Sequence, residues 1–216
     1  DVTGDHSRVV GYLAAALYEE QGGGGRAASP AARPATSDFG LSAEDKAVLH
    51  RIARQHIEAR CRTQAPPSLP QCSKALQQPR GAFVTLKRHG RLRGCIGHIV
   101  GNRPLPRTVA DMAMAAAFQD SRFPKLEERE LADLEIEISV LTPLQQIADP
   151  EMIQVGVHGI FLTQGDRSGL LLPQVATEQG WDRATFLEQA CRKAHLPSTA
   201  WRDPDTKIFI FSAEVF

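Results

Sequence analysis

The sequence predicts an α+β fold, a largely antiparallel β-sheet with flanking helices. Residues 134–141 alternate apolar and polar side chains, which is typical of a strand with one buried face. Residues 43–62 and 105–119 repeat apolar side chains with a helical period. Strand-like segments are joined by short turns, without regular β-α-β repetition, so most strand pairs should be antiparallel.

The first helix is expected from about Ala43 to Arg62. Ser42 is a natural N-cap, and Asp45, three residues later, can complete a capping box. Apolar side chains follow at helical spacing, and three prolines end the segment. The apolar residues are Val48, Leu49, Ile52, Ala53, Ile57 and Cys61, and the prolines are Pro66, Pro67 and Pro70.

A hairpin and a strand follow. Segments 82–87 and 92–100 flank His89-Gly90, which predicts two antiparallel strands joined by a tight turn. After the second helix, the strand 134–141 should turn one set of side chains inward and the other set outward. The inward set is Leu134, Ile136, Ile138 and Val140, and the outward set is Glu135, Glu137 and Ser139.

The C-terminal part predicts a second hairpin, a helix and a closing strand. Segments 159–165 and 168–172 form the hairpin around Asp166-Arg167. Asp182 is expected to cap a helix, and 207–211 to form the last strand.

Composition narrows the function classes. Lys and Arg number 25, as do Asp and Glu, so the formal net charge is +0 and the long-range field that favours nucleic-acid binding is missing. No apolar run is long enough to cross a bilayer. The four cysteines form neither a CxxC pair nor a disulfide framework, and no secretory signal is present, so a cytoplasmic location is expected.

The thiol of Cys95 lies in the run Leu92-Arg93-Gly94-Cys95-Ile96-Gly97 on a predicted strand. Alternation places Arg93 and Cys95 on one face, where the guanidinium would lower the thiol pKa, and strand glycines mark a bulge or a close backbone approach. The alternative is a small buried cysteine beside glycines that pack against a helix. The residues alone leave both readings open.

Several ordered motifs together resemble the Ammecr-type domain, component A of the AmmeMemoRadiSam system. They are LRGCIG at 92–97, DSRFP at 120–124, EISVL at 137–141, VGVHGI at 155–160, and LPQVA at 172–176 with Gly180-Trp181. The resemblance spans about 41–216. It implies a main lobe and a smaller lobe, and partnership with a Memo-like protein and a radical S-adenosylmethionine enzyme. S-adenosylmethionine and an iron–sulfur cluster are then expected only in that enzyme, and no cofactor in this chain.

The N-terminal part suggests a fusion. Residues 1–20 are similar to the C-terminal strand of a Memo-like domain, residues 21–41 form a flexible Gly- and Pro-containing linker, and 42–216 form the Ammecr-type domain. The pocket histidines of Memo-like domains would lie upstream, so no Memo activity is assigned to this chain.

The candidate site is drawn from the motif segments. Cys95 and Asp120 are the candidate catalytic residues. The candidate substrate- or partner-binding residues are Arg93, Gly94, Arg122, Glu137 and Gln174. In the alternative reading, Asp120 merely caps a helix end or pairs with Arg122, and Glu137 lies on a solvated sheet face.

Three functions are compatible with this site. The first is an accessory binding module without chemistry of its own, and the second is a catalytic or redox-active thiol protein. The third, RNA binding, rests on the basic run 87–93, which lacks stacking aromatics and is offset by the acidic stretch 127–130. No metal site is expected, because His50 and His56 do not share a helix face and no HExxH or paired CxxC occurs.

Overall fold

The computed structural model describes residues 8–10 and 39–216. The chain divides into two compact units. The described residues of the first are 8–10, 39–141 and 214–216, and those of the second are 142–213. The predicted linker and Memo-like remnant therefore lie largely outside the described residues.

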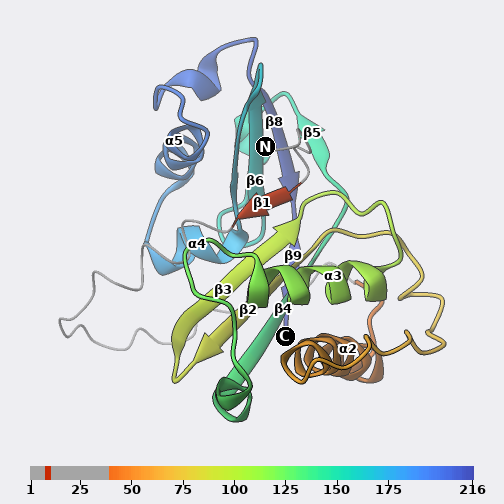
Figure 1. Cartoon of the computed structure of the whole chain (residues 1–216). Helices are drawn as coiled ribbons and strands as arrows, with labels where there is room; N and C mark the ends of the chain where they lie inside the picture. The colour runs from red at the N-terminus through yellow and green to blue at the C-terminus, as the bar shows by residue number, and fades with distance from the viewer. Residues whose placement is uncertain (1–7, 11–38) are drawn as a thin grey trace. The chain divides into compact units, whose positions relative to one another are not determined.

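The first unit contains a five-stranded sheet in the order β1-β3-β2-β4-β9 (Figure 1). The β1–β3, β2–β3 and β2–β4 pairs are all antiparallel, as the sequence predicts. The strands are β1 (Arg8–Val10), β2 (Ala82–Arg88), β3 (Arg91–His98), β4 (Leu134–Leu141) and β9 (Ala213–Val215).

The β2–β3 hairpin is confirmed, with one irregularity. His89 and Gly90 have φ values of 51° and 73°, which are the positive values that a tight two-residue hairpin turn requires. Leu86 pairs with Gly94, but Lys87 pairs with Leu92. Arg93 is therefore the extra residue of a β-bulge, which locally breaks the alternation of side chains.

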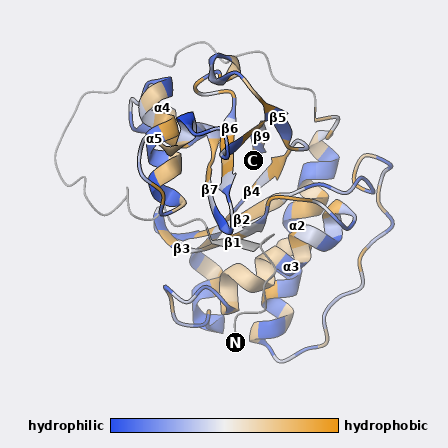
Figure 2. Cartoon of the chain, turned by 90° about the horizontal axis from the view of Figure 1, so that it is seen from above, coloured by the Kyte–Doolittle hydropathy of each residue, from blue (hydrophilic) through white to orange (hydrophobic). Residues whose placement is uncertain are grey.

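Two helices cover one face of this sheet. Helix α2 (Ala43–Cys61) begins at the predicted capping box, in which the Ser42 hydroxyl accepts from the Asp45 N–H and the Asp45 carboxylate accepts from the Ser42 N–H. Helix α3 (Leu105–Phe118) packs on β2 and β3, and α2 packs on α3 and β4 (Figure 1). Figure 2 shows α3 mostly in apolar colours. Its alanines and most of its larger apolar residues are buried and let the helix lie close to the sheet. The core of the unit lies between these helices and the sheet.

The predicted two-faced pattern of β4 holds only in part. Glu135 is exposed and Ile138 and Val140 are buried, but Ser139, predicted to face outward, is only 2% exposed. The C-terminal half of β4 is thus buried on both faces, which alternation cannot reveal.

The second unit is a four-stranded sheet in the order β5-β8-β6-β7, and α5 packs on β6 and β7. Asp182 caps α5 as predicted, its carboxylate accepting from the Thr185 N–H. The turn of the β6–β7 hairpin is Gly165-Asp166, one residue earlier than expected, with Gly165 at φ 57°. The elements are β5 (Gln145–Ile147), β6 (Gly159–Gln164), β7 (Arg167–Leu171), α4 (Pro173–Glu178), α5 (Arg183–Lys193) and β8 (Lys207–Phe211).

The α+β class is confirmed, with helices beside two antiparallel sheets. Strands β5 and β9, helix α4 and three short 3-10 helices were not predicted, because each is too short to show a period. The 3-10 helices are η1 (Glu128–Asp133), η2 (Pro150–Met152) and η3 (Ala200–Arg202). Within the described part of the chain, no helix has both the length and the apolar surface to span a membrane.

Candidate functional site

Three polar side chains form a row across β3, β2 and β4. Thr85 pairs in register with Cys95 on one side and with Glu137 on the other, so the three residues share one sheet face. The Thr85 Oγ1 lies 3.2 Å from the Cys95 Sγ. Lys87, two residues along β2, donates to Glu137 over 3.0 Å. This row places a thiol, a hydroxyl and a carboxylate side by side.

The Cys95 thiol is buried, with 2% of the residue exposed. Burial raises its pKa above the usual value of 9.0, and this outweighs the Thr85 hydrogen bond and the Arg122 charge, which act in the opposite direction. The thiol is therefore protonated at neutral pH. The expectation of a thiolate held by a neighbouring guanidinium is wrong, because the sulfur lies in the interior and desolvation dominates.

Asp120 and Arg122 clamp the main chain of Cys95. The Asp120 Oδ2 accepts from the Cys95 N–H at 2.9 Å, and the Arg122 Nη2 donates to the Cys95 carbonyl at 3.3 Å. The two side chains also pair with each other, at 2.7 Å between Arg122 Nη2 and Asp120 Oδ2 and 3.0 Å between Nε and Oδ1. Among the described residues, β1 pairs with β3 from Ile96 to His98, and the clamp satisfies the β3 backbone at the next position, Cys95.

The clamp fixes the charge of Asp120. Burial alone would raise the pKa of this carboxyl, but hydrogen bonds from Arg122 and from the Cys95 backbone outweigh it and hold the pKa below 3.8. The carboxylate is thus ionised and already occupied by two partners. The structure shows the pairing with Arg122 that the alternative reading considered.

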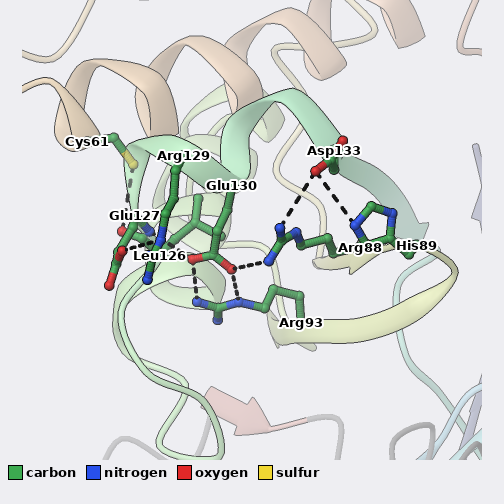
Figure 3. A network of polar contacts seen from close by, with 9 residues as sticks. All are labelled: Cys61, Arg88, His89, Arg93, Leu126, Glu127, Arg129, Glu130 and Asp133. Carbon is green, nitrogen blue, oxygen red and sulfur yellow. Dashed lines mark hydrogen bonds and ion pairs between the residues drawn. The ribbon is translucent and has the colours of Figure 1, made fainter.

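Arg93 points to Glu130, not to the thiol. Its Nε and Nη2 donate to the two Glu130 carboxylate oxygens at 2.8 and 3.0 Å (Figure 3). Both residues are buried, and Glu130 also lies 3.6 Å from Arg88. The bulge at Arg93 breaks the alternation on which the expected Arg93–Cys95 proximity was based.

Gly94 is a packing position. A Cβ on Gly94 would lie 2.2 Å from the Ala116 carbonyl oxygen of α3, so only glycine lets helix and strand approach this closely. A Cβ on Gly97 would similarly collide with the Phe83 ring. The predicted binding role of Gly94 therefore lacks an open surface, and the helix-packing alternative is what the structure shows.

The remaining predicted binding residues lie in different units. Glu137, on β4, belongs to the polar row, and its side chain is 35% accessible. Gln174 belongs to α4 of the second unit, where its carbonyl accepts from the Thr177 hydroxyl. In the first unit, Asp120 and Arg122 contact the main chain of Cys95. Glu137 lies in the same polar row as the Cys95 side chain.

Sequence reasoning missed three residues of this region. Thr85 could have been found from the hairpin register, which sets it opposite Cys95. Glu130 carries no local signal, since its partner Arg93 is 37 positions away. Phe123 lies under both cations, its ring centroid 5.4 Å from the Arg122 Cζ and 6.0 Å from the Arg93 Cζ.

No group of three or more His, Cys, Asp or Glu side chains is placed to hold a metal ion in the described part of the chain. Cys61, Cys72, Cys95 and Cys191 are all free thiols.

Known proteins share this two-sheet α+β fold. The AMMECR1 family profile matches residues 50–216, and the chain belongs to that family. A protein of Methanothermobacter thermautotrophicus is 42% identical over 186 residues, covering 82% of this chain and 95% of its own length. A Methanopyrus kandleri protein is 40% identical over 189 residues, covering 82% of this chain and 89% of its own.

A solved structure agrees with the fold. The crystal structure of the uncharacterized protein PH0010 from Pyrococcus horikoshii matches with a TM-score of 0.75 and 39% identity. The match covers 81% of this chain and 92% of that protein.

Proposed function

We propose that this chain is an accessory binding component of the AmmeMemoRadiSam system. It would work with a Memo-like protein and a radical S-adenosylmethionine enzyme in a modification pathway, without thiol chemistry of its own. The observation that carries the proposal is the Asp120–Arg122 clamp, which fixes the main chain of a buried, protonated Cys95. Such a clamp gives a rigid sheet surface for a partner, whereas a nucleophilic cysteine needs a thiolate that solvent or substrate can reach.

A catalytic or redox-active thiol is the second candidate. It is favoured by the polar row, because the Thr85 hydroxyl is 3.2 Å from the sulfur and Glu137 follows on the next strand. Burial and the raised pKa of Cys95 count against it.

RNA binding by the basic run 87–93 is less favoured than either. Three of its cations are already engaged by carboxylates. Lys87 pairs with Glu137, Arg88 with Glu130 and Asp133, and Arg93 with Glu130.

The proposal also covers the fusion to a Memo-like domain and the cellular location of the protein. Residues 1–20 would be the C-terminal remnant of a Memo-like domain and 21–41 its linker to the domain at 42–216. S-adenosylmethionine and the iron–sulfur cluster would belong to the partner enzyme. The four free cysteines support a reducing, cytoplasmic location.

The Cys95→Ser variant tests the proposal. The chain, the Memo-like protein and the radical enzyme are incubated together, and both complex formation and the product spectrum are measured. We expect Cys95→Ser to keep the affinity and the product yield within about twofold of the unmodified chain, because the clamp binds backbone atoms that serine retains. Cys191→Ser, a buried cysteine of the second unit, is the matched control for the cost of a buried hydroxyl.

Two results would contradict the proposal in different ways. Lost product yield with intact complex formation in Cys95→Ser alone would favour the catalytic thiol. Absence of a complex between the unmodified chain and either partner would remove the accessory role itself. Asp120→Asn, which breaks the ion pair of the clamp, should weaken the complex more than Cys95→Ser does.

A further inference from the structure

A groove of 490 Å³ runs along α2 on the other side of the sheet from Cys95. Its floor includes Ile136, which alternates on β4 with Glu137 and so lies on the opposite sheet face from the polar row. Its other lining residues all come from one face of α2. They are His50, Arg51, Arg54, Gln55 and Glu58.

One guanidinium in this groove is held in place. The Arg54 Nη1 donates to the Leu131 carbonyl at 3.2 Å, and its Nη2 donates to the Leu134 carbonyl. Its side chain is nevertheless 39% accessible. Arg54 thus presents a cation whose orientation is set before any ligand arrives, which reduces the entropy lost on binding.

A second guanidinium is available. Arg51 is exposed, and among the described residues it forms no ion pair or hydrogen bond. Glu58 is the one acidic group of the lining, and its carboxylate lies 3.8 Å from Arg54. It also lies 3.7 Å from Arg62, a residue that does not line the groove. The groove therefore has an excess of positive charge.

The other polar groups supply uncharged hydrogen-bonding atoms. Burial lowers the pKa of His50 below 6.5, so its ring is mostly neutral at pH 7. The ring packs edge-on against Phe216, with centroids 5.5 Å apart, which fixes its plane. Gln55 adds an amide beside it.

We propose that this groove binds a small organic oxyanion, a carboxylate or phosphate group attached to an apolar part that contacts Ile136. Arg51 can form forked, charge-assisted hydrogen bonds with such a group, and Arg54 adds a positive charge at a fixed position beside it. The volume falls in the range of small-molecule sites. Neither metal nor nucleic acid suits the lining, which has a single carboxylate and no Phe, Tyr or Trp side chain for base stacking.

The test uses the whole chain and two simple probes, inorganic phosphate and acetate. Each is titrated at constant ionic strength balanced with sodium chloride, so that general screening does not change. The NMR signals of the arginine Nε–H groups and of the His50 ring report binding. We expect saturable shifts, and the probe that binds more tightly identifies the head group.

Three variants make the test specific. Arg51→Ala should weaken binding about tenfold, since it removes a charge-assisted hydrogen bond. Arg60→Ala, an exposed arginine in the last turn of α2 outside the groove, should leave binding unchanged. Glu58→Gln should tighten binding severalfold, because it removes the one negative charge of the lining. Shifts that are linear in probe concentration, or equal in all variants, would overturn the proposal.

Discussion

The Arg93 guanidinium and the Glu130 carboxylate form a buried two-bond ion pair, with distances of 2.8 and 3.0 Å (Figure 3). Their side chains are only 10% and 11% accessible. Glu130 also accepts from the Glu127 N–H at 3.0 Å, so one carboxylate joins η1 to the bulge of β3. The arginine beside the cysteine thus has a structural partner, and it stabilises the strand that carries Cys95.

Loss of one partner of the Arg93–Glu130 pair should lower the free energy of unfolding. Glu130→Gln keeps the shape of the side chain but leaves the Arg93 charge without its counterion in the interior. We expect the free energy of unfolding to fall by about 3 kcal/mol, measured by urea denaturation at pH 7. Arg129→Ala removes a neighbouring arginine whose side chain is 80% accessible, and it should change stability by less than about 0.5 kcal/mol.

A double variant separates charge from packing. Replacing both members by apolar residues, as Arg93→Met with Glu130→Leu, should recover part of the loss, because no unpaired charge is left buried. A Glu130→Gln protein as stable as the unmodified chain would show that the pair contributes nothing.

The rate at which each of the four cysteines is alkylated should be lower the more deeply its thiol is buried. Burial raises the pKa of Cys95, and the residue is 2% exposed, whereas Cys72 is half-buried. We expect iodoacetamide at pH 8 to label Cys95 more than about tenfold more slowly than Cys72, as measured by peptide mass spectrometry. The Cys95 rate should rise only with urea concentrations that unfold the chain. Rapid native labelling of Cys95 with a midpoint below pH 8 would contradict the buried thiol.

The main elements could be predicted because their signals are local. Ser42 and Asp45 are three residues apart, and His89-Gly90 is a two-residue turn, so each can be recognised without knowing the fold. The shifted turn at Gly165 has a local cause too, since its positive φ suits glycine at the first turn position.

The site was less predictable because its contacts are distant in sequence. Alternation placed Arg93 beside Cys95, but a bulge, which has no sequence period, turned it to Glu130. The burial of Cys95 depends on packing around the whole sheet face, as does that of Ser139. Asp120 and Arg122 of the motif DSRFP hold backbone atoms of Cys95, a contact across 25 or more positions that no local pattern indicates.

Acid should destabilise the first unit through Asp120 and Glu130. Hydrogen bonds from arginine and backbone hold both pKa values below their usual 3.8 and 4.5. A lowered folded-state pKa stabilises the protein at pH values above the unfolded pKa, and this stability is lost as the pH falls through the folded value. The free energy of unfolding should therefore decrease as the pH falls below about 5.

The Asp120→Asn variant checks the sign of this effect. It should be less stable than the unmodified chain at pH 7, and the difference should shrink as the pH falls below 3.8 and through the lowered pKa of Asp120. Urea denaturation at a series of pH values measures both curves. A difference that stays constant over this range would show that the Asp120 charge does not contribute.

Gly94→Ala tests the helix-to-strand contact next to Cys95. In an ordinary strand, replacing glycine by alanine stabilises by about 0.5–1 kcal/mol. Here the new Cβ would lie 2.2 Å from the Ala116 carbonyl oxygen, a backbone atom that cannot rotate away. We expect a loss of about 3 kcal/mol in the free energy of unfolding. Arg91→Ala, at an exposed position on the same strand, should stay within about 0.5 kcal/mol. Because the two mechanisms predict opposite signs at Gly94, a stabilised Gly94→Ala protein would show that α3 does not pack on β3 at this distance.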